Sequence, residues 1–279
     1  MPRIAVGLEY HGANYAGWQL QQGLRTLQGV LQEAIGQVAA EPIHLACAGR
    51  TDAGVHAAGQ VAHFDTAAIR TARGWTLGAN THLPPDVSLS WAQQVPEHFH
   101  ARHSAQARAY RYLIANRPAR SALAAGRATL IHAPLDAERM AQAAALLIGE
   151  HDFSAFRAAE CQARTPVRRL ETLEVDRRGD WLLISATANA FLHHMVRNIA
   201  GLLICVGQGK ASPDWASEVL ESRDRTRGAA TAPADGLYLW GVRYPAVFDL
   251  PAHAPASCWA MIPGLPDFTS PTGSSHVVV

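Results

Sequence analysis

The chain has 279 residues, 48% of them hydrophobic, and a formal net charge of +1. This length allows one large domain or two medium ones, and the apolar content is ample for a hydrophobic core. A charge so close to zero excludes the strong overall positive field by which some nucleic-acid-binding proteins are recognised. No apolar run reaches the roughly 18 residues of a membrane span, and the N-terminus lacks a signal-peptide pattern, so we expect a cytoplasmic protein.

The first hundred residues mix strands and helices without a repeating strand–helix unit. Apolar runs and alternation predict strands over 3–10, 43–47, 60–64 and 86–95. A helix is predicted from residue 27, where Thr26 can act as the N-cap, and a second one over about 69–80.

The next part of the chain has a similar order of elements. Strands are predicted over 106–115, 167–175, 181–188 and 237–244, and helices after Asp136, over 192–206 and near 213–222. Each half then has about four strands and two helices, which indicates an α+β fold of two α/β sandwiches with helices on one face of each sheet. We expect domains at 1–100 and 101–248. Residues 249–279 contain five prolines and no periodicity, which predicts an irregular or disordered tail.

An unusual loop, GRTDAGVH at 49–56, lies between two of the predicted strands. Gly49 and Gly54 permit backbone conformations that other residues avoid. Arg50 and Asp52 are two residues apart, so in an extended backbone their charged groups point to the same side. The loop is either an ordinary turn with a local ion pair or a site that presents a carboxylate for chemistry.

The cysteines and the basic residues have informative positions. Cys47, Cys161, Cys205 and Cys258 form no CxxC pair, which predicts neither a disulfide framework nor a zinc cluster. No acidic residue occurs from 98 to 135, an interval that contains two tyrosines, Tyr110 and Tyr112, and six arginines: Arg102, Arg108, Arg111, Arg117, Arg120 and Arg127. Such a stretch is typical of a groove that follows a nucleic-acid backbone, although a solvated strand and loop give the same pattern.

Five segments, in order and at similar spacing, resemble motifs of the TruA family of tRNA pseudouridine synthases. They are YHGANYAGWQ at 10–19, GRTDAGVH at 49–56, ARAYRY at 107–112, FLHHMVRN at 191–198 and GLYL at 236–239. His11 stands where the family usually has Asp. The resemblance covers about residues 3–245, so only the tail falls outside it.

The resemblance implies a fold and an activity. The fold would be two ferredoxin- or RRM-like α+β domains whose antiparallel sheets join, with the active site in the cleft between them. The activity would be isomerisation of uridine to pseudouridine at positions 38, 39 and 40 of the tRNA anticodon stem-loop. The resemblance also implies a homodimer and neither a metal ion nor another cofactor.

The resemblance assigns roles to five residues. Asp52 would be the nucleophile, and Arg197 would keep its carboxylate ionised and aimed. Tyr110 would stack on the target uracil and accept the proton from C5. Arg50 would fill the gap that the flipped uridine leaves, and Leu237 would form an apolar wall of the pocket.

Other interpretations of these residues remain open from the sequence. Arg197 could be a surface residue of its helix, and Tyr110 could belong to the core. A metal site at His193 and His194 is not favoured, because adjacent residues in a helix point about 100° apart and no carboxylate lies one turn away.

Two alternative functions also remain open. A non-catalytic RNA-binding protein would keep the arginine-rich stretch but would not need Asp52. A hydrolase with an Asp nucleophile would need Asp52 and a histidine that activates water, and His56 is close enough in sequence to be that histidine.

Overall fold

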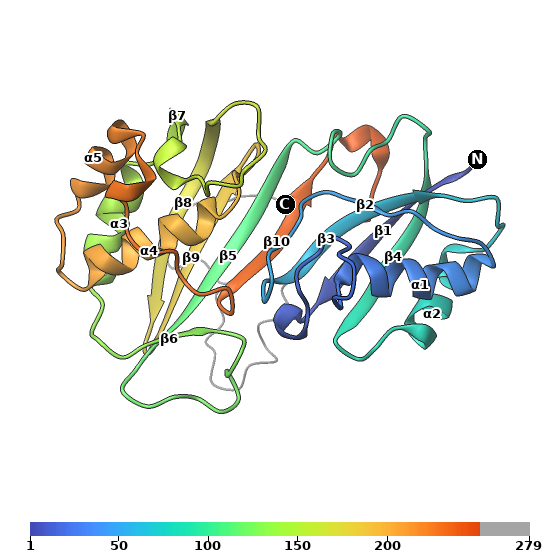
Figure 1. Cartoon of the computed structure of the whole chain (residues 1–279), viewed down its shortest axis with the longest axis horizontal. Helices are drawn as coiled ribbons and strands as arrows, with labels where there is room; N and C mark the ends of the chain where they lie inside the picture. The colour runs from blue at the N-terminus through green and yellow to red at the C-terminus, as the bar shows by residue number, and fades with distance from the viewer. Residues whose placement is uncertain (252–279) are drawn as a thin grey trace.

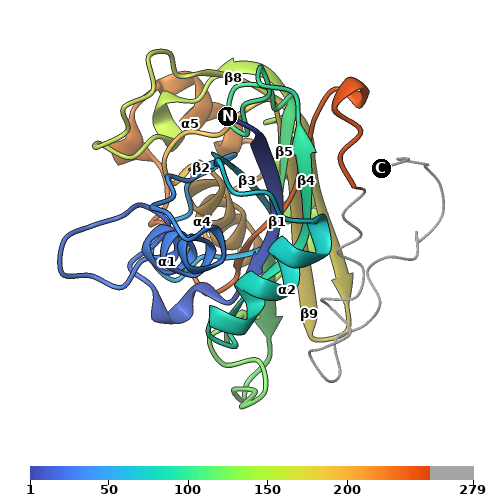
Figure 2. The ribbon, with the colours of Figure 1, turned by 90° about the vertical axis from the view of Figure 1, so that its right-hand side faces the viewer.

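The computed structural model of the chain describes residues 1–251, which form one large sheet with helices packed against it (Figure 1). The strands are β1 (Arg3–Tyr10), β2 (Ala46–Cys47), β3 (His56–Asp65), β4 (Val87–Val95), β5 (Ala107–Asn116), β6 (Thr129–Ile131), β7 (Gly149–Asp152), β8 (Val167–Arg178), β9 (Trp181–Ala188) and β10 (Leu237–Arg243). Their order is β4-β1-β3-β10-β5-β9-β8-β7, while β2 pairs with β3 and β6 pairs with β5. Figure 2 shows helices on one side of this sheet.

Five helices occur within residues 1–251, two of them at caps that the sequence predicts. They are α1 (Leu27–Ala39), α2 (Ala72–His82), α3 (Ala137–Ala145), α4 (Met195–Gly207) and α5 (Trp215–Ser222). The Thr26 hydroxyl accepts a hydrogen bond from the Gly29 amide at the start of α1. The Asp136 carboxylate accepts bonds from the first amides of α3, so both caps satisfy donors that a helix leaves unpaired.

The sheet is continuous, and β10 connects its two parts. This strand lies parallel to β3 and antiparallel to β5, whereas the other pairs along the path from β4 to β7 are antiparallel. The mostly antiparallel α+β class is therefore confirmed. The boundary between domains at residue 100 stays a prediction, because a strand from the end of the described chain borders both parts of the sheet.

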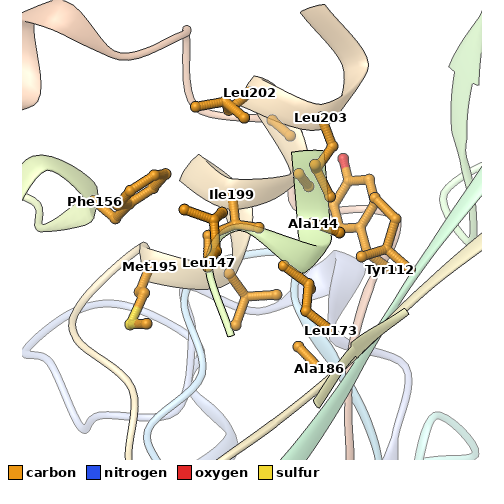
Figure 3. Packing of buried hydrophobic residues seen from close by; sticks show 14 of the residues in the cluster. Tyr112, Ala144, Leu147, Phe156, Leu173, Ala186, Met195, Ile199, Leu202 and Leu203 are labelled. Atoms are coloured by element: carbon orange, nitrogen blue, oxygen red, sulfur yellow. The ribbon is translucent and has the colours of Figure 1, made fainter. Parts of the chain in front are cut away.

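Two large hydrophobic clusters anchor the helices to the sheet. One packs α3 and α4 against β5, β8 and β9, and the other packs α1 and α2 against β1, β3 and β4. Figure 3 shows Ile199, Leu202 and Leu203 of α4 within the first cluster, together with Tyr112 of β5 and Leu173 of β8. The apolar stripe of α4 thus fixes this helix against the sheet, and with it every residue at the start of the helix.

Three local predictions differ from the structure. The short strands β6 and β7 were not expected, and β2 has only two residues. The strand after the 49–56 loop begins at His56, four residues earlier than predicted. Helix α4 begins at Met195 rather than at residue 192, because His194 has a left-handed backbone with φ 62°.

Two further expectations concern the cysteines and the membrane. Cys47, Cys161 and Cys205 are free thiols, and Cys258 lies outside the described residues. Within 1–251, no helix is long and apolar enough to cross a membrane. Nearly all of the expected tail, from residue 252 onward, also lies outside the described part of the chain.

Candidate active site

The loop that carries Asp52 connects β2 to β3 and rests on the segment that follows β1. The Trp18 amide donates to the Thr51 carbonyl over 2.9 Å, and the Tyr10 hydroxyl lies 2.8 Å from the Thr51 hydroxyl. A Cβ on Gly17 would come within 2.8 Å of the same carbonyl, and Gly17 has φ +87°. The 10–19 and 49–56 motifs therefore form one unit in which Thr51 faces inward and Asp52 remains 23% exposed.

The Asp52 carboxylate meets three side chains from the other end of the chain. Its Oδ2 lies 3.1 Å from Arg197 Nη1 and 3.2 Å from His194 Nε2. Its Oδ1 lies 3.3 Å from His193 Nε2. Arg50 takes no part in this arrangement, so the alternative of a turn with a local ion pair is wrong, and Asp52 pairs instead with the distant Arg197.

Arg197 is held on two sides. The side chain projects from the first turn of α4, and only 16% of it is exposed. Its Nε donates to the Ala232 carbonyl over 2.9 Å while Nη1 donates to Asp52. The guanidinium is therefore fixed in place before any substrate arrives. This placement overturns the alternative of a surface arginine.

His193 and His194 are site residues that the sequence prediction missed. Within a helix the two side chains would point about 100° apart, but His194 is the N-cap of α4 and its left-handed backbone turns the two rings toward each other. The ring centroids are 4.1 Å apart, and both Nε2 atoms face Asp52. The adjacent histidines were the available signal. Their convergence depends on one positive φ angle and on a carboxylate 141 and 142 positions earlier in the chain.

Burial, the Arg197 guanidinium and the His193 imidazole shape the charge state of His194. Partial burial is the largest effect and lowers the pKa of His194 from its usual value. Asp52 acts in the opposite direction, whereas His193 and Arg197 lower the pKa further. His194 is therefore mainly neutral at pH 7 and can donate a single hydrogen bond to Asp52.

Tyr110 is half-buried and lies next to the Asp52 loop. Its ring makes an edge contact with Phe191, with 5.0 Å between centroids, and a Cβ on Gly49 would lie 3.4 Å from its hydroxyl. Burial first, and the Asp52 carboxylate second, raise the pKa of Tyr110 above its usual value. The phenol is thus neutral at physiological pH, and its hydroxyl lies beside Gly49 of the loop.

Arg50 and Leu237 differ in exposure to solvent. Arg50 is exposed, and its side chain has no hydrogen bond or ion pair within residues 1–251. Leu237 is 5% exposed, pairs with Tyr112 across the β10–β5 ladder and belongs to the core. Leu237 therefore lies behind the site, whereas Arg50 is available to a ligand.

The six arginines between 98 and 135 do not line a single groove. Arg108 is buried and donates to four backbone carbonyls, among them Ala48 and Asn189. Arg111 alternates with Tyr110 along β5 and lies over the Trp240 ring, 3.9 Å from its centroid. The exposed arginines, Arg102, Arg120 and Arg127, lie beyond opposite ends of β5. The predicted groove is therefore wrong for Arg108, which stabilises the fold, and stays a prediction for the others.

His56 does not face Asp52. Its Nδ1 accepts a hydrogen bond from the Gly12 amide and its Nε2 lies 3.2 Å from the Asp235 carbonyl. The ring lies between those of His11 and Tyr238. Both nitrogens are engaged, so His56 cannot activate water for the hydrolase alternative.

Known proteins resemble the chain over almost all of the described residues. A family model described as tRNA pseudouridine synthase matches residues 8–104 and 143–245. The tRNA pseudouridine synthase A of Methylococcus capsulatus is 57% identical over 252 residues, which cover 90% of this chain and 93% of the relative. The protein of the same name from Nitrosococcus oceani is 56% identical over 92% of this chain and 100% of its own, and that from Cronobacter sakazakii is 54% identical over 89% and 92%. Since these matches include both the Asp52 loop and the start of α4, the chain belongs to the tRNA pseudouridine synthase family.

Proposed function

We propose that the protein isomerises uridine to pseudouridine in the tRNA anticodon stem-loop, with Asp52 as the nucleophile. The observation that carries this proposal is the Asp52 carboxylate, partly exposed on a glycine-bounded loop and fixed by Arg197 at 3.1 Å. A carboxylate that only stabilised the fold would gain nothing from this exposure. The family and the names of the relatives favour tRNA as the substrate.

The reaction requires no net oxidation or hydrolysis. The N1–C1′ bond breaks, the base turns, a C5–C1′ bond forms, and the proton on C5 is replaced by one on N1. Asp52 forms the covalent intermediate that divides this exchange into two steps. Arg197 keeps the carboxylate oriented and stabilises it when it leaves. The carboxylate is regenerated at the end of each turnover.

Tyr110 provides a surface for the flipped base. Removing a nucleotide from the stack costs a few kcal/mol. Stacking on an aromatic ring returns about 1–3 kcal/mol per base. Because the phenol is neutral, its oxygen can take the C5 proton only if its own proton leaves at the same time. Tyr110 is therefore a stacking residue first and a proton relay second.

Arg50 and Leu237 complete the proposed site. The Arg50 guanidinium, exposed and unpaired within 1–251, fills the position in the RNA that the flipped uridine leaves. Leu237 supports the pocket from the core side, because its side chain packs in the same cluster as Tyr112.

The finer features of the substrate and assembly rest on the resemblance to the family. We propose positions 38, 39 and 40 of tRNA as targets, action in the cytoplasm where tRNA is found, and a homodimer whose subunits both contact one tRNA. Light scattering with and without tRNA tests the dimer. A monomer at concentrations that support full activity would contradict it.

The decisive experiment uses unmodified tRNA labelled with tritium at C5 of uridine. Release of tritium measures loss of the C5 proton, and mapping of pseudouridine then gives the modified positions. We expect release with the wild-type protein and none with Asp52→Asn. Binding of tRNA without release would support the RNA-binding alternative, and pseudouridine only outside 38–40 would overturn the proposed position.

A further inference from the structure

Asp52, His193 and His194 bring three possible metal ligands together at one place on the protein. One ligand atom from each of Asp52, His193 and His194 lies within 4.8 Å of the others, and within residues 1–251 this is the one such group of His, Cys, Asp or Glu. Ligands about 2.0–2.1 Å from a tetrahedral zinc ion are about 3.3 Å from one another. The distance between His193 Nε2 and Asp52 Oδ1 is 3.3 Å. This separation therefore matches one edge of a tetrahedral site, and His194 supplies a third ligand atom within 4.8 Å of the other two.

The open fourth ligand position and the groups that contact the three ligands also suit a metal ion. Asp52, His193 and His194 are each partly exposed, which leaves an open position for water as in three-ligand zinc sites. Arg197 donates to Oδ2, which His194 also contacts, whereas His193 contacts Oδ1, the oxygen that we assign to the ion. The Glu160 carboxylate lies 4.0 Å from His193 Nδ1, on the side of the ring where ligand histidines usually have an acidic partner.

We propose that Asp52, His193 and His194 form a binding site for a divalent transition metal ion, with Zn²⁺ as the best match, and that the bound ion inhibits the protein. Two imidazoles and one carboxylate suit Zn²⁺ better than Mg²⁺ or Ca²⁺, which prefer oxygen ligands. An ion on Oδ1 occupies the electron pair with which Asp52 attacks the nucleotide. The inhibition, unlike the binding, rests on the proposed function.

The first test measures binding alone. The full chain, without any affinity tag and after EDTA treatment, is titrated with Zn²⁺ by calorimetry, and with Co²⁺ by visible absorption for tetrahedral geometry. We expect one strong site whose affinity falls at least about tenfold in each of His193→Gln, His194→Gln and Asp52→Asn. The matched control is His132→Gln, an exposed histidine away from Asp52, which should leave the strong site unchanged.

The second test measures tritium release with and without Zn²⁺. We expect Zn²⁺ to slow the wild-type reaction and EDTA to restore it. Equal Zn²⁺ affinity in the wild type and the three site variants would overturn the inference, as would a strong site lost in His132→Gln. Circular dichroism identifies a variant that fails to fold. If a histidine variant does, the Zn²⁺ affinity of Asp52→Asn, which removes no side-chain volume, tests the site instead. An active protein that binds no Zn²⁺ overturns the inference alone, whereas an inactive one that binds Zn²⁺ overturns the proposed function alone.

Discussion

Histidines on the two sides of the Asp52 loop have opposite roles. His56 is only four residues after Asp52, yet it points away, is 1% exposed and uses both ring nitrogens on backbone groups. His193 and His194 come from a distant helix cap, are partly exposed and face the carboxylate at 3.3 and 3.2 Å. Closeness in sequence therefore gives little information about which histidine contacts the carboxylate. Exposure and the partners of each nitrogen decide it.

His56 and His194 also differ in what sets their pKa values. Burial lowers the pKa of His56 to about 4, so the ring is neutral and structural. Burial also lowers the pKa of His194, but Asp52 opposes that effect. His56 is thus a neutral ring that contacts backbone groups. At the Asp52 site, by contrast, a carboxylate contacts a guanidinium and two imidazoles. We therefore expect changes around His56 to affect stability and changes around Asp52 to affect the reaction.

Asp52→Asn should have the largest effect on the reaction. The substitution keeps the shape of the side chain but removes the nucleophile, so we expect the single-turnover rate to fall at least about a thousandfold. The melting temperature and the affinity for tRNA should change little, because Asn has the same shape and Asp52 lies on a partly exposed loop outside the core. A rate within tenfold of the wild type would remove Asp52 from the mechanism.

Arg197→Ala should cost about a hundredfold in rate, and Arg197→Lys about tenfold. The alanine variant loses both the charge at Asp52 and the bond to the Ala232 carbonyl, whereas lysine restores charge without the planar set of donors. Single-turnover rates at saturating tRNA measure the difference. Identical rates for the three proteins would mean that the ion pair has no role in the chemical step.

Tyr110→Phe should keep stacking and lose the phenolic oxygen. We expect turnover to fall about tenfold or more, as for loss of a proton-transfer group, while tRNA affinity stays within about twofold. An intermediate that retains its C5 tritium should accumulate, and gel analysis of the covalent complex detects it. Wild-type turnover in this variant would make Tyr110 a stacking residue only.

Acid should destabilise the protein through His56. Its pKa is about 4 in the folded state against 6.5 as the ordinary value, so the unfolded chain binds more protons between these pH values. Stability from this group is complete above pH 6.5 and is lost as the pH falls toward 4, by up to about 3 kcal/mol as an upper bound. Urea unfolding at pH 7 and pH 5 measures the loss.

The control for the acid effect is His56→Gln. This variant should be less stable at pH 7 and should lose less stability between pH 7 and pH 5. His63, also buried and with its pKa lowered to about 4, contributes in the same direction in both proteins. Equal losses in the wild type and the variant would show that His56 is not the neutral structural ring described above.

The sequence by itself determined the elements whose signals are local. The caps at Thr26 and Asp136, the apolar stripe of α4 and the hairpin of β8 and β9 follow from residue order and period, and the structure confirms them. Asp52 also stood out locally, because glycine and small residues surround a single carboxylate. Short strands such as β6 gave no signal, since three residues show no period and pair only because β5 lies beside them.

Only the tertiary structure decided which groups meet Asp52. Arg197 lies 145 positions away, and its reach depends on the packing of α4 against the sheet and on the Ala232 carbonyl. The left-handed backbone of His194 turns two rings onto one carboxylate, an orientation that helical spacing excludes. The burial of Arg108 likewise removed it from the candidate RNA surface. The spacing of apolar and polar residues predicts local helices and strands. Contacts between side chains far apart in the sequence depend on how those helices and strands pack together.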